Sequence, residues 1–206
     1  VLYTIVAIIA GFLVGAIFLL IAGISPAVAY GKLFDSIFSK PKYLVWTLVY
    51  ASPLIFTGLS VAFSFRTGVF NIGAEGQFVI GSLVACVLGI VLKLPPVLHA
   101  LVCLVAAAAA GCIWSLIVGV LKVKRGIQRG INEVLSYIMF NWIAFYLSNY
   151  VVNLPGIHRE SSEATLDIAE NARLLLPEGI RKALDCNAAH WGILFAVIAA
   201  VVIWVI

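Results

Sequence analysis

Long apolar stretches alternate with short polar ones along most of the chain. The apolar stretches cover residues 1–30, 44–65, 78–92, 97–120, 134–152 and the residues from Ala189 onward. A helix needs about 20 predominantly apolar residues to cross the hydrocarbon core of a bilayer. The pattern therefore predicts about six transmembrane helices, with a short interfacial helix over residues 31–43. Pro53 is expected to bend or break the second span.

Composition identifies the solvent that surrounds these helices. Hydrophobic residues make up 64% of the 206 residues and charged residues 11%, whereas soluble domains are about 45–50% apolar. A soluble fold of this size could not bury that much apolar surface. We therefore expect an all-α, polytopic helical membrane protein, with residues 1–206 forming a single transmembrane domain. The chain lacks an initial Met and its last apolar run has no polar flank, so we expect a fragment that lacks C-terminal helices.

The distribution of charge predicts the orientation in the membrane. Residues 122–133 form the most basic polar stretch, whereas the long stretch 153–188 carries four basic and six acidic residues. Lys and Arg accumulate in short cytoplasmic loops, so we place 122–133 inside as a loop and 153–188 outside. Alternation then puts Arg66 inside and the 93–96 turn outside. Residues 31–43 disagree, because this external loop carries Lys32, Lys40 and Lys42 against Asp35 alone.

No local pattern indicates a catalytic or metal-binding site. The three histidines lack a second ligand at helical spacing, and the four cysteines form no CxxC pair. Nucleophile-elbow, phosphate-loop and HExxH patterns are also absent. We expect no metal and no cofactor in this chain. A membrane enzyme assembled from distant spans is the least supported function.

The first polar interruption, RTGVFNIGAEGQ at residues 66–77, lies between two predicted spans. Irregular backbone survives at membrane depth only when it is buried in protein or lines a wet cavity. A charge there costs about 2.5–3.5 kcal/mol on insertion scales. One interpretation has Asn71 cap the next helix and Glu75 complement its dipole. The other, which the first does not exclude, has Asn71, Glu75 and Gln77 face a solute pathway.

The second interruption covers residues 132–142 at the start of the fifth span. Asn132 is placed to cap that helix, and Glu133 falls in its first turn. Asn141 lies within the span, where an Asn side chain either joins helices or contacts a solute. Helical spacing allows one face to be shared by Glu133, by Ser136 or Tyr137, and by Phe140 or Asn141.

These stretches resemble a known family. The segment FRTGVFNIGAEGQFVIG, residues 65–81, is similar to a signature of ABC permeases that serve branched-chain amino acids, ribose-type sugars and nucleosides. PLIFTGLSVAF at 53–63 and GINEVLSYIMFNWIA at 130–144 resemble the nucleoside branch, and the GGIDLSVG sequence of the sugar branch is absent. The resemblance implies a permease subunit of a bacterial inner membrane that carries nucleosides by ATP-driven alternating access. Riboflavin, a sugar or a branched-chain amino acid is the alternative cargo, and a secondary transporter or channel the alternative class.

The resemblance also implies partners and pathway residues. A second homologous permease, ATP-binding subunits, an external substrate-binding (lipo)protein and membrane lipids are expected, and nucleic acid is not. The coupling loop that engages the ATPase in this family lies beyond the sixth span. Polar pathway residues would hydrogen-bond the solute, and aromatic ones would either stack on its ring or simply pack. The expected set is Asn71, Glu75, Gln77, Asn132, Glu133, Asn141, Phe65, Phe70 and Trp142.

Overall fold

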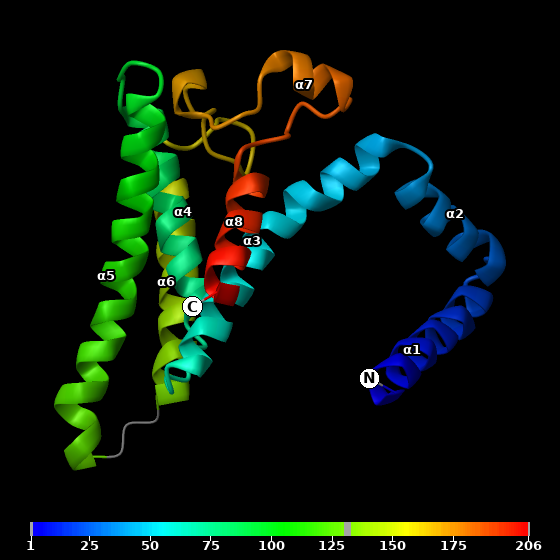
Figure 1. Cartoon of the computed structure of the whole chain (residues 1–206), viewed down its shortest axis with the longest axis horizontal. Helices are drawn as coiled ribbons and strands as arrows, with labels where there is room; N and C mark the ends of the chain where they lie inside the picture. Colours follow the sequence, from blue (N-terminus) through cyan, green and yellow to red (C-terminus); the bar gives the residue numbers. More distant parts are fainter. Residues whose placement is uncertain (1, 130–132, 206) are drawn as a thin grey trace. The chain divides into compact units, whose positions relative to one another are not determined.

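A computed structural model describes residues 2–129 and 133–205, without the side chains of 122–129 and 133. Its elements are α1 (Leu2–Ile21), α2 (Pro26–Phe38), α3 (Pro41–Arg66), α4 (Ala74–Val91), α5 (Leu98–Arg129), α6 (Glu133–Val152), the 3-10 turn η1 (Glu170–Ala172), α7 (Glu178–Ala183) and α8 (Gly192–Val205) (Figure 1). In these two ranges β-pairing is limited to the isolated bridges His158–Thr165 and Leu175–His190. The predicted all-α class is confirmed.

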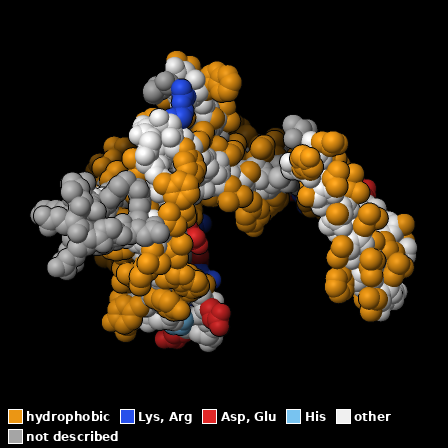
Figure 2. Space-filling model, turned by 90° about the horizontal axis from the view of Figure 1, so that it is seen from below, with side chains coloured by type: hydrophobic (Ala, Val, Ile, Leu, Met, Phe, Trp, Pro, Cys, Tyr) orange, Lys and Arg blue, Asp and Glu red, His pale blue; other side chains and the backbone are white. Residues whose placement is uncertain are grey.

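Four of these helices have the length and apolarity of a membrane span: α1, α3, α4 and residues 98–121 of α5. Helix α6 has 20 residues but includes Asn141 and Asn149, and α8 is a shorter apolar helix of 14 residues. Hydrophobic side chains cover most of the face seen in Figure 2, as expected where lipid replaces water. The chain is a polytopic helical membrane protein.

The chain divides into two compact units, the first formed by residues up to Val49 together with Pro177–Ala189. Within it, the Tyr30 hydroxyl on α2 donates to the Phe12 carbonyl on α1 at 2.7 Å. Lys42 Nζ, in the first turn of α3, lies 3.0 Å from Asp185 Oδ2 after α7. The first helix ends at Ile21 and not at residue 30 as predicted, because Gly23 adopts φ 75° and Pro26 begins a new helix. Part of the predicted first span therefore belongs to α2.

The second unit contains Tyr50–Leu176 and the residues from His190 onward. Helix α3 continues as one helix through Pro53 to Arg66. Of the two effects expected of Pro53, the break therefore does not occur, and the bend stays a prediction. Membrane helices tolerate proline where neighbouring groups satisfy the freed carbonyl. The single domain expected from the sequence stays a prediction.

Helix α4 packs against both α5 and α6, and small residues allow the close approach (Figure 1). A Cβ added to Gly81 would lie 3.0 Å from the Ala107 carbonyl oxygen, and one on Gly111 would lie 3.3 Å from that of Gln77. Such contacts between small residues are typical of membrane helix interfaces. They fix the depth at which α4 begins relative to α5.

The stretch 122–133, predicted as a basic loop, is helical as far as Arg129. Its Lys, Arg and Gln residues are good helix formers, so α5 continues after its apolar part has ended. Residues 130–132 lie outside the described part of the chain. The interpretation of the basic stretch as a loop was therefore wrong for at least its first eight residues.

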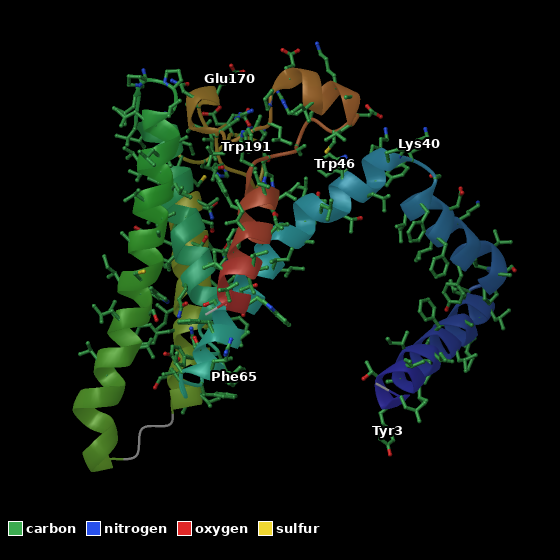
Figure 3. The ribbon with its side chains drawn as sticks, in the orientation of Figure 1. Tyr3, Lys40, Trp46, Phe65, Glu170 and Trp191 are labelled. Carbon is green, nitrogen blue, oxygen red and sulfur yellow. The ribbon has the colours of Figure 1, made fainter. Side chains whose placement is uncertain are left out.

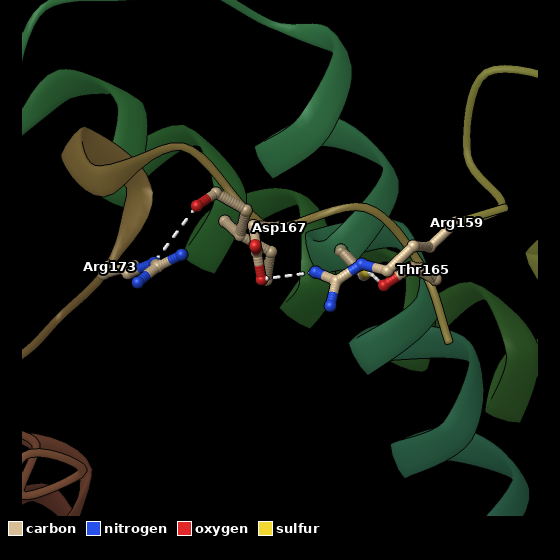
Figure 4. Close-up of polar contacts among 6 residues, drawn as sticks. Arg159, Thr165, Asp167 and Arg173 are labelled. Carbon is tan, nitrogen blue, oxygen red and sulfur yellow. Dashed lines mark hydrogen bonds and ion pairs between the residues drawn. The ribbon is translucent and has the colours of Figure 1, made fainter. Parts of the chain in front are cut away.

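The segment after α6 folds over one end of α4 and α5. Ala169 N donates to the Gly89 carbonyl at 3.0 Å, and Asn171 Nδ2 donates to the Leu94 carbonyl at 2.9 Å. Arg159 Nη2 lies 2.8 Å from Asp167 Oδ1 and holds the segment together (Figure 4). Figure 3 shows Glu170 of this segment at the opposite end of the unit from Phe65. The orientation expected from charge makes this the external end.

Candidate functional site

The non-helical residues between α3 and α4 are organised by the side chain of Asn71. Its Oδ1 accepts hydrogen bonds from Gly73 N at 2.9 Å and from Gln77 Nε2 at 3.2 Å. The Asn71 side chain is buried, whereas Gln77 is half-buried. Helix α4 begins at Ala74 with Gly73 at its N-cap position. Asn71 therefore fixes the turn before the helix and is not its N-cap residue, which corrects one of the two interpretations of the sequence.

Asn141 ties α6 to the same turn. Its Oδ1 accepts from Gly76 N at 3.0 Å, and its Nδ2 donates to the Ile72 carbonyl at 3.2 Å. Gly76 is in the first turn of α4, whose N–H groups have no partner within the helix. One side chain thus satisfies a donor and an acceptor of irregular backbone. Of the two roles considered for Asn141, the contacts within the chain supply the first, a link between helices.

Glycines permit this close approach of three helices. A Cβ on Gly76 would lie 2.7 Å from Asn141 Oδ1 and 3.2 Å from both Asn141 Cα and Trp114 Nε1. A Cβ on Gly73 would overlap the Tyr137 ring. The indole nitrogen of Trp114 is buried, and no acceptor for it lies in the part of the chain that the structure describes. We refer to Gly76, Trp114 and Asn141 as the three-helix junction.

The three-helix junction lies at membrane depth. Trp114 precedes Leu121, the end of the apolar part of α5, by seven residues, which is about 10 Å along a helix. Asn141 follows the start of α6 by eight residues, or about 12 Å. Both helices therefore place the start of α4 inside the apolar layer. Polar groups at such a depth are expensive unless they are paired or adjoin a wet cavity.

A cavity of about 380 Å³ adjoins this junction. Its volume is within the range of about 300–1,000 Å³ that is usual for small-molecule sites. Its lining comes from the start of α4 and one face of α6 and comprises Ile72, Glu75, Ile138, Asn141, Trp142 and Phe145. The cavity is therefore mostly apolar, with one carboxylate and one amide.

Glu75 is the side chain of this lining that remains available as a hydrogen-bond acceptor. It is exposed, and it makes no hydrogen bond or ion pair with any side chain that the structure describes, which leaves those of 122–129 and 133 aside. It lies in the first turn of α4, the end of the helix that carries a partial positive charge. Asn141, by contrast, already uses both its oxygen and its nitrogen. The cavity thus presents one free acceptor group.

Aromatic side chains form the wall on α6. The rings of Trp142 and Tyr146 are stacked, with centroids 6.1 Å apart and an interplanar angle of 28°. Phe145 contacts both rings edge to face, at 6.1 Å from Trp142 and 5.6 Å from Tyr146. Such mutual packing restricts the rings, so that a flat ligand would meet a preformed surface.

The predicted pathway residues fall into four groups. Glu75, Asn141 and Trp142 line the cavity, whereas Asn71 and Gln77 support the turn beside it. Phe65 and Phe70 contact each other edge to face at 5.0 Å and do not line the cavity. Figure 3 shows Phe65 near the end of α3. Asn132 lies outside the described residues, and of Glu133 only the backbone, which begins α6, is described. For all the predicted pathway residues, contact with a solute stays a prediction.

Sequence reasoning missed Ile138, Phe145 and Trp114, and it considered Tyr137 only as a neighbour of Asn141 on one helix face. Ile138 and Phe145 lie three residues before and four after Asn141, so helical spacing was a signal that could have found them. Tyr137 and Trp114 enter the site only because α5 and α6 both approach the first turn of α4. Within residues 2–129 and 133–205, no three His, Cys, Asp or Glu side chains gather in a way that would hold a metal ion.

Asn71→Ala is expected to destabilise the start of α4. The variant loses the acceptor for Gly73 N and for the Gln77 amide, and a hydrogen bond within a protein contributes about 1 kcal/mol. Hydrogen exchange of amides 73–77 in the complete permease should accelerate, whereas amides in the middle of α6 should not change. Unaltered exchange at 73–77 would contradict the role given to Asn71.

Comparison with known proteins now identifies the family. The family described as "branched-chain amino acid transport system / permease component" matches residues 43–206. The chain belongs to this permease family. Family membership and the apolar helices together place it in the inner membrane as a multi-pass protein.

Several curated relatives are similar over nearly the whole chain. The guanosine ABC transporter permease protein NupP of Bacillus subtilis is 37% identical over 100% of this chain and 57% of its own length. The glucose ABC transporter permease protein TsgB13 of Haloferax volcanii is 31% identical over 97% of this chain and 53% of its own length. The nucleoside ABC transporter permease protein NupB of Lactococcus lactis is 28% identical over 100% of this chain and 57% of its own length. The chain thus spans a little over half the length of these relatives. No solved structure matches it.

Proposed function

We propose that this chain forms the membrane-spanning part of an ABC importer permease that carries nucleosides, or similar ring-bearing solutes, across the inner membrane. One observation carries the proposal. A cavity of about 380 Å³, with a free carboxylate and an aromatic wall, adjoins irregular backbone at membrane depth. Lipid cannot solvate such groups, whereas a polar solute and its water can.

The chemistry of the cavity suits a nucleoside. The base is a flat ring that can stack on Trp142 or Phe145, and sugar and base both carry hydrogen-bond donors for Glu75. Two of the relatives named above are permeases for guanosine or nucleosides, which supports the same cargo. The resemblance of residues 53–63 and 130–144 to the nucleoside branch adds to that support.

Transport in this proposal depends on partner subunits. A second permease would complete the pathway, an external binding protein would deliver the solute, and ATP-hydrolysing subunits would drive alternating access. The role of this chain is to expose and close the cavity while α4 keeps its position on α6. The two hydrogen bonds of Asn141 serve that purpose, because they hold the broken backbone to a continuous helix.

A sugar is the second candidate cargo. The glucose permease of Haloferax volcanii is 31% identical to this chain, and aromatic walls with a carboxylate also suit sugar rings. The test is uptake by cells that lack their own nucleoside import and express the complete importer. Labelled guanosine uptake that resists excess glucose supports the nucleoside proposal. Uptake of glucose alone would overturn it in favour of the sugar.

Trp142→Ala is expected to lower the initial rate of guanosine uptake in the same cells. Stacking of a base on an aromatic side chain contributes about 1–3 kcal/mol, which corresponds to a reduction of about 5- to 150-fold. Trp142→Phe should retain part of the uptake, because it keeps a flat ring.

The matched control is Tyr150→Ala. Tyr150 is another aromatic residue of α6, is 67% exposed and does not line the cavity, so uptake should stay near the original rate. Equal rates for Trp142→Ala and the unchanged importer, at equal amounts of protein in the membrane, would contradict the stacking role.

A further inference from the structure

We propose that Glu75 makes the cavity selective for neutral solutes with two adjacent O–H or N–H donors, and against solutes that carry a negative charge. The proposal rests on the proposed function and names the chemistry by which that cavity would choose its cargo. It concerns binding within the permease itself, apart from any selection by an external binding protein.

The first step is the inventory of polar groups in the cavity. Of its six lining residues, Ile72, Ile138 and Phe145 have apolar side chains, and Trp142 adds one indole N–H, which can donate but not accept. The oxygen and nitrogen of Asn141 are engaged by Gly76 and by the Ile72 carbonyl. Glu75 is exposed and makes no polar contact with the side chains that the structure describes. Hydrogen bonding of a solute in this cavity therefore falls mainly to the carboxylate of Glu75.

The second step is what a carboxylate accepts. An ionised carboxylate has two oxygens and no donor, and it binds best a group that presents two parallel donors. A ribose presents the adjacent 2′- and 3′-hydroxyls, and guanine presents N1–H beside its exocyclic amine. Either pair satisfies Glu75 while the base lies on the Trp142 wall. A solute without paired donors would leave one oxygen unpaired.

The third step is the sign of the charge. None of the six lining residues is Lys or Arg, so the described cavity offers no countercharge for a phosphate or a carboxylate. A negative group brought near Glu75 meets repulsion that water screens poorly in an apolar surrounding. The cavity should therefore reject nucleoside monophosphates, although they carry the same base and sugar as nucleosides.

The experiment measures binding of tritiated guanosine to the complete purified importer in nanodiscs, by scintillation proximity and without the external binding protein. Glu75→Gln is expected to weaken guanosine binding by about tenfold or more, because the amide offers one acceptor and adds a donor. The unchanged protein should bind guanosine 5′-monophosphate at least tenfold more weakly than guanosine, and Glu75→Gln should narrow that gap. Glu75→Asp keeps the charge and should preserve the gap while binding guanosine more weakly.

Two analogues separate the possible donor pairs. If the ribose diol contacts Glu75, 2′,3′-dideoxyguanosine should bind weakly to the unchanged protein and should be insensitive to Glu75→Gln. If the base edge contacts Glu75, inosine, which lacks the exocyclic amine, should show that behaviour. Strong, Glu75-dependent binding of both analogues would overturn the paired-donor proposal.

Glu163→Gln is the matched control. Glu163 is an exposed carboxylate of the segment after α6 and lies outside the cavity, so guanosine binding should not change. Unaltered guanosine binding in Glu75→Gln, or an unaltered gap to the monophosphate, would overturn the role of Glu75 and leave the proposed function in place. Failure of the unchanged importer to bind any nucleoside would overturn the proposed function and the Glu75 proposal together.

Discussion

Asn141→Ala is expected to destabilise the permease and to abolish most of its transport. The change leaves Gly76 N–H and the Ile72 carbonyl without their partner at membrane depth. An unsatisfied buried group costs about 1–3 kcal/mol, whereas hydrogen bonds between membrane helices average only about 0.6 kcal/mol in double-mutant cycles. Two groups lost together therefore give an expected destabilisation of about 2 kcal/mol.

Thermal unfolding of the complete permease in detergent checks this expectation. A loss of about 2 kcal/mol lowers the midpoint by about 4–8 °C in a domain of 150–250 residues, and by less in a longer chain. Hydrogen exchange should accelerate at Gly76 in particular, because its N–H is the donor to Asn141.

The control for this prediction is Asn149→Ala. It makes the same change on α6 at an exposed position, so both the midpoint and the transport rate should stay close to those of the original protein. Equal midpoints for the two alanine variants would contradict the structural role of Asn141. A normal midpoint with lost transport in Asn141→Ala would instead favour direct contact with the solute.

Much of the helical order could be predicted, because hydrophobic run length is a direct consequence of bilayer thickness. Helix α6 was expected over 134–152 and covers Glu133–Val152. The predictions were wrong where the start of a polar stretch was interpreted as the end of a helix. Helix α5 passes Lys122 and continues to Arg129, because a polar helix beyond the apolar layer loses nothing by staying helical. Conversely, the end of α1 could not be predicted, because residues 22–30 are also mostly apolar. That end depends on the backbone conformation of Gly23.

The candidate site could be predicted only in part. Polar residues inside apolar runs drew attention to Glu75 and Asn141, since their cost in a membrane demands an explanation. Their contacts could not be foreseen, because Asn141 bonds to residues that precede it by 65 and 69 positions. The position of Trp114 beside Gly76 depends likewise on how α5 crosses α4. The spacing of residues along one helix predicts which side chains share a face. Which residues of other helices they contact depends on how the helices pack.

Gly76→Ala is expected to have an effect comparable to that of Asn141→Ala, for a steric reason. The new Cβ would lie 2.7 Å from Asn141 Oδ1 and 3.2 Å from Asn141 Cα and from Trp114 Nε1. Relief requires α4 to move away from both neighbours, and overpacking of this kind costs about 1–3 kcal/mol. The midpoint of thermal unfolding and guanosine uptake should both fall.

The matched control is Gly58→Ala in α3, where an added Cβ meets no atom within 4 Å. Alanine is a better helix former than glycine by about 1 kcal/mol, so this variant should be as stable as the original protein or more stable. The same substitution is thus expected to act in opposite directions at the two glycines. A neutral Gly76→Ala variant would show that α4 does not approach α5 and α6 as closely as the three-helix junction requires.

Combining Gly76→Ala with Asn141→Ala separates the steric cause from a general loss of helix packing. Removal of the Asn141 amide eliminates the 2.7 Å contact with the added methyl group. It also removes the hydrogen bond to Gly76 N, so the methyl group can no longer disrupt that bond. Contacting residues show interaction energies of about 0.5–3 kcal/mol in such cycles. The double variant should therefore be more stable than the sum of the two single losses predicts, by about 1 kcal/mol within that range. Strict additivity would mean that the two residues do not meet, and the hydrogen bond that places α4 on α6 would be refuted with it.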